Sequence, residues 1–323
     1  KKALSYQTVE IDTTAFDASI PAPLVAAPKV TIEDVAAFEA WKKSNVIAQK
    51  QAGYVAIGIK VALGDFYTDK ARALADLIKN YGANELRFTL RQDILIRNIK
   101  EENLPFFYQE LAQLDFVTLG YNTINDVTAC PGTDTCNLGI ASSTGIAVEL
   151  ERVLATEYPQ YSNNQEITIK ISGCMNACGQ HNMAEIGFQG MSINSGKLVA
   201  PALQVLLGGG NLGNGQGRFS DKVIKIPSRR GPEALRLILN DFEANANGQS
   251  FLDYYDTKGE KYFYEYLKPL VDVTNLTEAD FVDWGNADNY VKAVGVGECA
   301  GVVIDLVATL LVEAKDKLTF SQE

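Results

Sequence analysis

The stretches TACPGTDTCNLGIASS (128–143) and KISGCMNACGQHN (170–182) carry four of the five cysteines in the chain. Cys130 and Cys136 form a C-x5-C pair, and Cys174 and Cys178 form a C-x3-C pair. Glycines beside both pairs let the backbone turn sharply and point N–H groups at anionic sulfur. Four thiolates offered as two local pairs are a common way to hold a soft metal centre. The spacing therefore predicts a four-cysteine metal site.

A [4Fe-4S] cluster and a structural zinc ion are the two candidates for this site. Zinc sites usually use cysteine pairs separated by about two to four residues, so the wider first pair favours the cluster. Four buried thiols without a metal are disfavoured, because buried free cysteines do not need glycine loops on both sides. Cys299 lies far from the other four and is interpreted as a small buried residue.

Length and composition indicate an ordinary globular protein of 323 residues, enough for two domains. The net charge of −11 argues against nucleic acid as a partner, because such binding relies on lysine and arginine. No apolar run reaches the roughly 18–20 residues that span a membrane. Cysteines clustered in this way indicate metal ligands rather than disulfides, so we expect a cytoplasmic protein. The start has no Met and no apolar core, so we expect the numbering to begin inside a longer gene product.

Residues 46–120 are expected to form a ferredoxin-like half-domain. Alternating and helical periodicities predict strands over 54–61 and 116–120, a hairpin over 86–99, and helices over 68–82 and 101–114. The order β-α-β-β-α-β is that of a ferredoxin-like sandwich. Residues 1–45 precede it as a proline-containing linker and a first helix, for which Thr31 is a plausible N-cap.

Residues 121–245 are expected to form a mixed α/β domain that holds the cysteines. Helices fit 144–154 and 231–244, and strands fit 166–172, 184–188, 202–208 and 222–226. The run LGGGNLGNGQG (207–217) lacks the glycine order of a dinucleotide-binding loop and is interpreted as a flexible loop. Residues 246–323 are expected to be a helical C-terminal extension that ends in an amphipathic helix over 297–318. The fold class is therefore α+β.

The cysteine stretches, extended to TACPGTDTCNLGIASSTGIA and IKISGCMNACGQHNMAEIGFQG, strongly resemble the sirohaem-dependent sulfite and nitrite reductases. The resemblance runs back through QKQAGYVAIGIKVALGD and LRFTLRQDILI and forward through PALQVLLGGG and IPSRRGPEALRLIL. It covers roughly residues 45–245. Two long segments that agree in order and spacing are far more specific than a count of cysteines.

This resemblance implies cofactors and an activity. The four cysteines would bind one [4Fe-4S] cluster, and Cys178 would also be the axial ligand that bridges to the sirohaem iron. Asn176 would lie against the sirohaem rim. The implied activity is the six-electron reduction of sulfite to sulfide or of nitrite to ammonia, for which a cluster beside the haem acts as an electron store.

Three arginines and the single histidine are further candidates. Arg87, Arg91 and Arg97 lie on the expected hairpin, with Thr89 beside them, and the family's corresponding hairpin reaches the sirohaem in its first half. A solvated or salt-bridged strand face is an equally good interpretation of these arginines. His181 follows Cys178 by three residues and is interpreted as a hydrogen-bonding neighbour of the cluster rather than as a proton donor to the substrate.

The family's reductases consist of two similar halves, and this chain resembles the C-terminal half alone. Most basic residues that grip the substrate anion belong to the N-terminal half, so we expect the chain to need that half as a partner and to be inactive without it. Ferredoxin or a flavoprotein is the expected electron donor. The residues do not distinguish sulfite from nitrite. The alternative interpretation is a non-catalytic module in which an iron–sulfur cluster or zinc serves structure or electron transfer.

Overall fold

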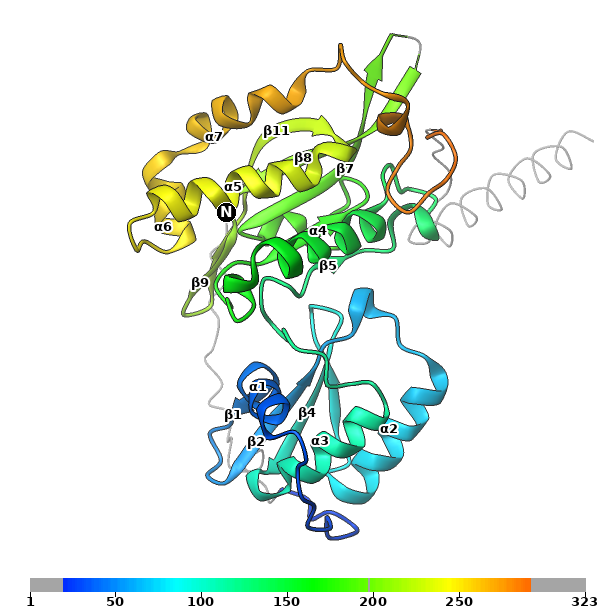
Figure 1. Ribbon diagram of the computed structural model, residues 1–323, viewed down its shortest axis with the longest axis vertical. Helices are drawn as coiled ribbons and strands as arrows, with labels where there is room; N and C mark the ends of the chain where they lie inside the picture. The colour runs from blue at the N-terminus through cyan, green and yellow to red at the C-terminus, as the bar shows by residue number, and fades with distance from the viewer. Residues whose placement is uncertain (1–19, 197, 292–323) are drawn as a thin grey trace, which may run out of the picture. The chain divides into compact units, whose positions relative to one another are not determined.

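The computed structural model describes residues 20–196 and 198–291 (Figure 1). The chain divides into two compact units. Unit 1 extends to Leu119, and unit 2 begins at Gly120 and also includes Ala62–Gly64. Cys299 and the helix expected over 297–318 lie outside the described residues. Within the described part, no helix is long and apolar enough to cross a membrane.

Unit 1 is a four-stranded antiparallel sheet packed against helices, in the strand order β1-β2-β4-β3 (Figure 1). Its strands are β1 (Val46–Ala48), β2 (Tyr54–Ile59), β3 (Leu86–Phe88) and β4 (Ile94–Lys100), and its helices are α1 (Val35–Asn45), α2 (Thr68–Tyr81) and α3 (Leu104–Gln113). Leu74 of α2 and Phe107 of α3 are fully buried in one core with Ile57 and Ile96 of the sheet. The apolar residues that recur at helical spacing in the sequence therefore lie on the buried face of each helix.

Two expectations for unit 1 are wrong in detail. The strand expected over 116–120 is absent, and β1 occupies the edge beside β2. The chain turns at Asp115, where φ is 62°, and Phe116 donates its N–H to the Leu111 carbonyl, so this segment closes α3 instead of entering the sheet. The first helix is capped by Asp34 rather than Thr31, because the Asp34 carboxylate accepts the Ala37 N–H at 2.9 Å.

Unit 2 contains a five-stranded mixed sheet in the order β11-β8-β7-β6-β5. The strands are β5 (Thr128–Ala129), β6 (Ile169–Ser172), β7 (Ile186–Ser195), β8 (Leu198–Leu207) and β11 (Asp221–Pro227). β5, β6 and β7 are parallel to one another, whereas β8 is antiparallel to both β7 and β11. The parallel part of the sheet is therefore the part that carries the cysteine segments.

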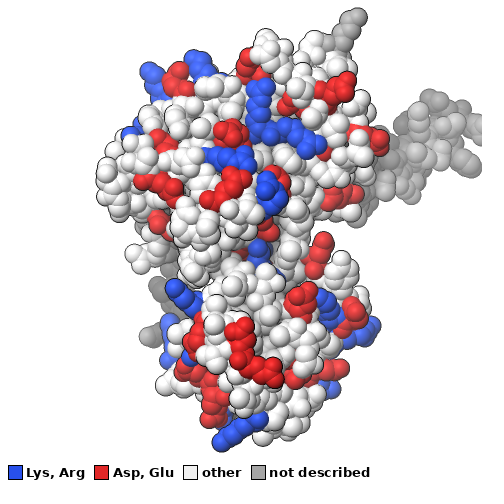
Figure 2. All heavy atoms as spheres, viewed as in Figure 1, with Lys and Arg blue, Asp and Glu red and all other residues white. Residues whose placement is uncertain are grey.

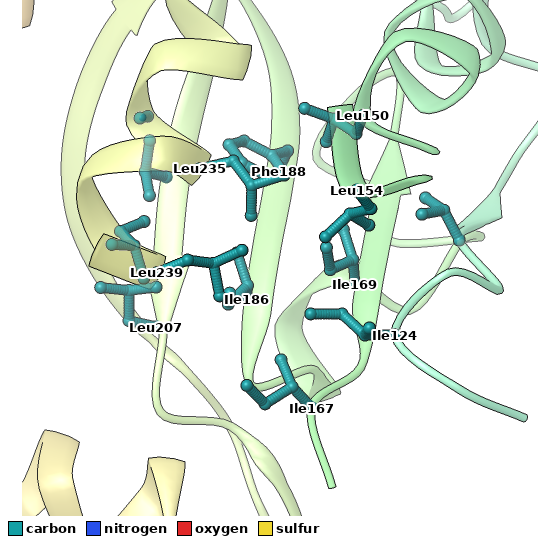
Figure 3. Close-up of a cluster of buried hydrophobic side chains, with 14 of the residues drawn as sticks. Ile124, Leu150, Leu154, Ile167, Ile169, Ile186, Phe188, Leu207, Leu235 and Leu239 are labelled. Atoms are coloured by element: carbon teal, nitrogen blue, oxygen red, sulfur yellow. The ribbon is translucent and has the colours of Figure 1, made fainter. Parts of the chain in front are cut away.

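Helices α4 (Ser143–Glu157) and α5 (Gly231–Asn245) lie side by side over the sheet (Figure 1). Their leucines face the apolar side chains of β6, β7 and β8 (Figure 3). Among the labelled residues are Leu150 and Leu154 of α4, Leu235 and Leu239 of α5, and Ile169, Ile186, Phe188 and Leu207 of the strands. All are almost fully buried. The α+β class expected from the sequence is confirmed.

The later part of unit 2 contributes to the same core. Helices α6 (Phe251–Lys258) and α7 (Glu260–Leu267) bury Phe251, Tyr254 and Phe263 against it. Two 3-10 turns, Lys268–Val271 and Glu278–Phe281, follow α7. We call residues 279–291 the strap.

The glycine-rich run forms a hairpin instead of the flexible loop that the sequence predicts. Residues 207–217 were expected to be a flexible loop, but Gly210–Gly213 (β9) and Gln216–Arg218 (β10) pair as an antiparallel ribbon. Asn214 and Gly215 make its turn with positive φ values of 52° and 74°. An Asn-Gly pair adopts this backbone conformation readily, so a tight hairpin is the physical outcome.

Candidate metal centre

The four cysteines lie on two loops at one edge of the sheet of unit 2. Cys130 directly follows β5, and Cys174 follows β6 after a single glycine. Because β5 and β6 are adjacent and parallel, their carboxyl ends meet at the same edge. We call residues 130–142 the first cysteine loop and residues 173–183 the second cysteine loop.

Backbone hydrogen bonds hold the two loops together. Cys130 donates its N–H to the Ile171 carbonyl at 3.2 Å. The N–H groups of Ile140 and Ala141 both donate to the Gly173 carbonyl, at 2.8 and 3.1 Å. The Gly173 N–H points at the Cys130 sulfur at 3.2 Å. The sheet register and these bonds together bring the two pairs, which are far apart in sequence, to one place.

Glycine at position 179 is required by close packing. A Cβ atom there would overlap the Ile171 carbonyl oxygen and would lie 3.1 Å from the Cys130 nitrogen. Gly179 also donates its N–H to the Ser172 hydroxyl at 3.0 Å. The second cysteine loop therefore folds directly against the end of β6, with no space for a side chain at this point.

Helix α4 begins at the first cysteine loop. Ser142 is its N-cap and accepts the Gly145 N–H, as expected for serine at this position. The Ser143 hydroxyl donates to the Cys130 carbonyl at 2.7 Å and lies 3.5 Å from the Cys130 sulfur. The first turn of α4 therefore lies next to the Cys130 thiol.

The thiols differ in exposure. Cys174 is buried at 8% exposure, whereas Cys178 is exposed and Cys130 and Cys136 are intermediate. Burial raises the pKa of Cys174, the Asn176 N–H lowers it, and the neighbouring Cys130 and Cys136 raise it further. Cys174 is therefore within electrostatic reach of the first pair, and a bound metal would favour its thiolate form.

The donor set fits an iron–sulfur cluster better than a single ion. Among residues 20–196 and 198–291, no three thiol, carboxylate or imidazole groups converge closely enough to hold one metal ion. Zinc would need its four sulfurs around one atom, at about 2.3 Å each. A cluster takes each thiolate on a different iron and therefore accepts a wider set of sulfurs. Two adjoining loops that carry four cysteines, with the Gly173 N–H aimed at the Cys130 sulfur, match that need.

His181 is buried at the end of the second cysteine loop, with 2% of its surface exposed. Burial, with the nearby Lys222 charge as a smaller cause, lowers its pKa to about 4. The imidazole is therefore neutral at neutral pH and carries no proton to donate as an acid. This supports the sequence interpretation of His181 as a neighbour of the site rather than as a general acid.

The other predicted cofactor residues fall into two groups. Asn176 is an exposed residue between Cys174 and Cys178 in the second cysteine loop. Arg87 and Arg91 belong to unit 1, so their predicted contact with a cofactor remains a prediction. The Glu85 Oε1 atom lies 2.9 Å from Arg87 Nε and 3.6 Å from Arg97 Nε, which agrees with a salt-bridged strand face. Thr89 accepts the N–H groups of Arg91 and Asp93 and shapes the turn of the hairpin.

Sequence reasoning missed several residues that support the cysteine loops. Lys170 donates to the Gln180 side chain at 2.7 Å, from the sheet face opposite to Ile169 and Ile171. The hydroxyl of Ser143 was missed as well, although a serine pair before a helical pattern is a recognisable N-cap signal. Asp283, which accepts the Ser142 N–H at 2.7 Å, had no signal in the sequence because 141 residues separate the two.

Comparison with known protein families agrees with this architecture. Residues 47–114 match the nitrite/sulfite reductase ferredoxin-like half domain, and residues 120–265 match the nitrite and sulphite reductase 4Fe-4S domain. Fold and site thus define an oxidoreductase module in which a ferredoxin-like half domain precedes a 4Fe-4S domain. The chain belongs to the nitrite and sulfite reductase family, as the sequence predicted.

The chain is similar both to proteins named nitrite reductases and to a protein named a sulfite reductase. It is 27% identical over 191 residues to a ferredoxin–nitrite reductase of Synechococcus elongatus, covering 58% of this chain and 35% of that protein. It is 26% identical over 233 residues to an assimilatory ferredoxin-dependent nitrite reductase of Haloferax mediterranei, covering 72% and 40%. It is 30% identical over 170 residues to a sulfite reductase [ferredoxin] of Mycolicibacterium paratuberculosis, covering 51% and 30%.

A solved structure shares the fold. The NirA protein of Mycobacterium tuberculosis superposes with a TM-score of 0.55 at 25% identity, covering 75% of this chain and 43% of that one. The chain spans about a third to two fifths of the length of the curated relatives it matches. Similarity over this part does not by itself assign the activity of the whole relatives to this chain.

Proposed function

We propose that this chain is the cluster-bearing part of an assimilatory reductase that converts sulfite to sulfide or nitrite to ammonia in a six-electron reaction. Cys130, Cys136, Cys174 and Cys178 would bind a [4Fe-4S] cluster, and Cys178 would also be the axial ligand of a sirohaem. The observation that carries the proposal is the joining of the two cysteine loops by backbone hydrogen bonds at the end of two parallel strands. When bound, the cluster would supply single electrons and the sirohaem would supply a coordination site for the anion.

The exposure of the thiols supports the role assigned to Cys178. A ligand shared between a cluster and a second cofactor must face outward, and Cys178 is the exposed member of the four. Met175, three residues earlier in the same loop, is 73% exposed. An exposed apolar side chain beside an exposed thiol suits a flat macrocycle that covers both.

The charge of the chain supports a role for further polypeptide in substrate binding. Acidic and basic side chains are interspersed on the face shown in Figure 2, and the net charge is −11. An anionic substrate is repelled by such a field unless local cations hold it. We therefore propose that the N-terminal half of a family reductase supplies most of these cations and completes the site. Ferredoxin is the proposed electron donor, because the nitrite and sulfite reductases compared above are ferredoxin-dependent by name.

Metal and pigment analysis of the purified chain tests the cluster. We expect about four irons and four labile sulfides per chain, and loss of both when Cys174 is replaced by serine. The Cys299→Ser variant is the matched control and is expected to keep them. Zinc as the bound metal, or equal iron loss in the two variants, would contradict the proposal and favour a structural module.

A complementation experiment tests the activity. The chain is assayed alone and after co-expression with the N-terminal half of a family reductase, with sulfite and nitrite compared under the same conditions. We expect tetrapyrrole absorption and reductase activity only in the second case, and both to be lost in a Cys178→Ser variant. Turnover of either anion by the chain alone would show that it does not need the other half.

A further inference from the structure

We propose that the strap, residues 279–291, positions the first cysteine loop for its metal centre and that Asp283 and Tyr290 are the positioning residues. The inference rests on the proposed cluster-binding function but concerns residues beyond the 120–265 match to the 4Fe-4S domain. In Figure 1 the strap passes beside the start of α4, where the first cysteine loop ends. Its hydrogen bonds reach Ile140 and Ser142, in the segment that follows Cys136.

Arg229 anchors the strap to the rest of unit 2. Its Nε donates to the carbonyls of Ala279 and Val282, at 3.2 and 2.8 Å, and one of its terminal nitrogens donates to the Asp283 carbonyl at 3.2 Å. The guanidinium carbon lies 4.4 Å from the centre of the Trp284 ring. The indole N–H of Trp284 in turn donates to the Ser228 carbonyl at 3.0 Å. The planar Arg229 guanidinium donates to three carbonyls and stacks on one ring, and it therefore holds this stretch of backbone in one position.

Asp283 joins the strap to the end of the first cysteine loop. Its carboxylate is buried and accepts the Ser142 N–H at 2.7 Å, the Ser228 hydroxyl at 3.2 Å and its neighbour's Trp284 N–H at 2.9 Å. Ser142 is the N-cap of α4, and Ser143 next to it contacts Cys130. The position of Cys130 relative to the helix therefore depends on a carboxylate that lies far away in sequence.

Tyr290 holds the middle of the same loop. Its hydroxyl donates to the Ile140 carbonyl at 2.7 Å, while the Ile140 N–H donates to Gly173 of the second cysteine loop. The Ala141 N–H, which shares a peptide unit with the Ile140 carbonyl, also donates to Gly173, so this peptide is fixed to the second loop on one side and to the strap on the other. Tyr290 also donates its own N–H to the Phe281 carbonyl at 2.6 Å, which closes the strap on itself.

A cavity of about 430 Å³ lies between the strap and the first cysteine loop. Cys136 and Asn137 line it on the loop side, and Asn286, Asn289 and Tyr290 line it on the strap side. The strap therefore also forms the wall that limits access of solutes to Cys136. Loosening the strap is expected to open this cavity and to expose the Cys136 thiol or its bound metal.

The test uses the full chain and two substitutions, Tyr290→Phe and Asp283→Asn. The first readout is the rate at which iodoacetamide alkylates Cys136 in the metal-free chain, followed by mass spectrometry. The second is the rate at which a reconstituted cluster loses iron to a chelator, together with its midpoint potential. Loss of one hydrogen bond predicts rates about fivefold higher for Tyr290→Phe, and loss of buried carboxylate contacts predicts a larger increase for Asp283→Asn.

Matched controls separate positioning from general stability. Tyr264→Phe alters an exposed tyrosine of α7, and Asp241→Asn alters a buried carboxylate that accepts the hydroxyls of Tyr254 and Tyr262, at 2.6 and 2.8 Å. Both controls are expected to leave Cys136 alkylation and the potential at wild-type values, although Asp241→Asn lowers the melting temperature. Wild-type rates in both strap variants, or an equal acceleration by Asp241→Asn, would overturn the inference. If the wild-type chain binds no cluster, the proposed function fails while the alkylation rates still decide the role of the strap.

Discussion

The two cysteine loops are positioned by different parts of the chain. The second loop lies directly against the strand that precedes it, because Gly179 contacts the Ile171 carbonyl and donates to Ser172. The first loop is held by residues distant in sequence, through Gly173 on one side and through Asp283 on the other. One pair of cysteines therefore depends on local backbone geometry and the other on long-range contacts.

The two kinds of support predict which substitutions each pair of cysteines should tolerate. A locally packed loop is sensitive to any added atom, since backbone cannot move away from backbone. A loop held by separate hydrogen bonds loses less stabilisation with each substitution, because each bond contributes only about 1 kcal/mol. The second loop should respond to steric changes and the first to the removal of polar groups.

The largest effect is expected from Gly179→Ala in the second loop. The new methyl group would overlap the Ile171 carbonyl oxygen, so the loop must shift away from β6. We expect a loss of about 2–4 kcal/mol in the free energy of unfolding of unit 2 and loss of iron binding. Chemical denaturation and iron analysis measure the two.

Gly196→Ala in the β7–β8 turn is the control for Gly179→Ala. Position 196 has a positive φ of 61° but open space around it, so only backbone strain of about 1 kcal/mol is expected. Equal destabilisation by the two substitutions would show that contact with β6 does not position the second loop.

An intermediate effect is expected from acid, through His181 at the end of the second loop. Burial lowers the pKa of His181 to about 4, below its unfolded value near 6.5. Between these values the unfolded chain binds the extra proton, so stability falls as pH falls through this window and is unaffected above it. The His181→Gln variant should lack this component, which amounts to at most about 1.4 kcal/mol per pH unit. Denaturation curves from pH 4 to pH 7 provide the measurement, and parallel curves for both proteins would refute the prediction.

The smallest effect is expected from Ser143→Ala in the first loop. The substitution removes the 2.7 Å bond to the Cys130 carbonyl and the hydroxyl near its sulfur. We expect a loss of about 1 kcal/mol and faster alkylation of Cys130 in the metal-free chain. Thr156→Ala removes a hydroxyl bond to the Arg152 carbonyl in the same helix and is the matched control. A similar change in Cys130 reactivity in both variants would mean that the Ser143 hydroxyl has no particular role.

Local patterns were enough to predict most elements. The helix expected over 68–82 is observed as Thr68–Tyr81, and the helix expected over 231–244 as Gly231–Asn245. These elements were predictable because amphipathic periodicity depends only on near neighbours. The edge strand of unit 1 was not, because Val46–Ala48 and the segment at 116–120 both suit a sheet edge and only the whole sheet selects between them.

The sequence was enough to predict four paired cysteines as the candidate ligands and to identify the family, because cysteine spacing and flanking glycines are local properties of the chain. How the two cysteine loops are held in place is visible only in the tertiary structure. The contacts of Asp283 with Ser142 and of Tyr290 with Ile140 join residues 141 and 150 positions apart. Such contacts have no signature in one sequence, because a buried carboxylate or hydroxyl finds its partner only when the sheet and helices have brought distant segments together.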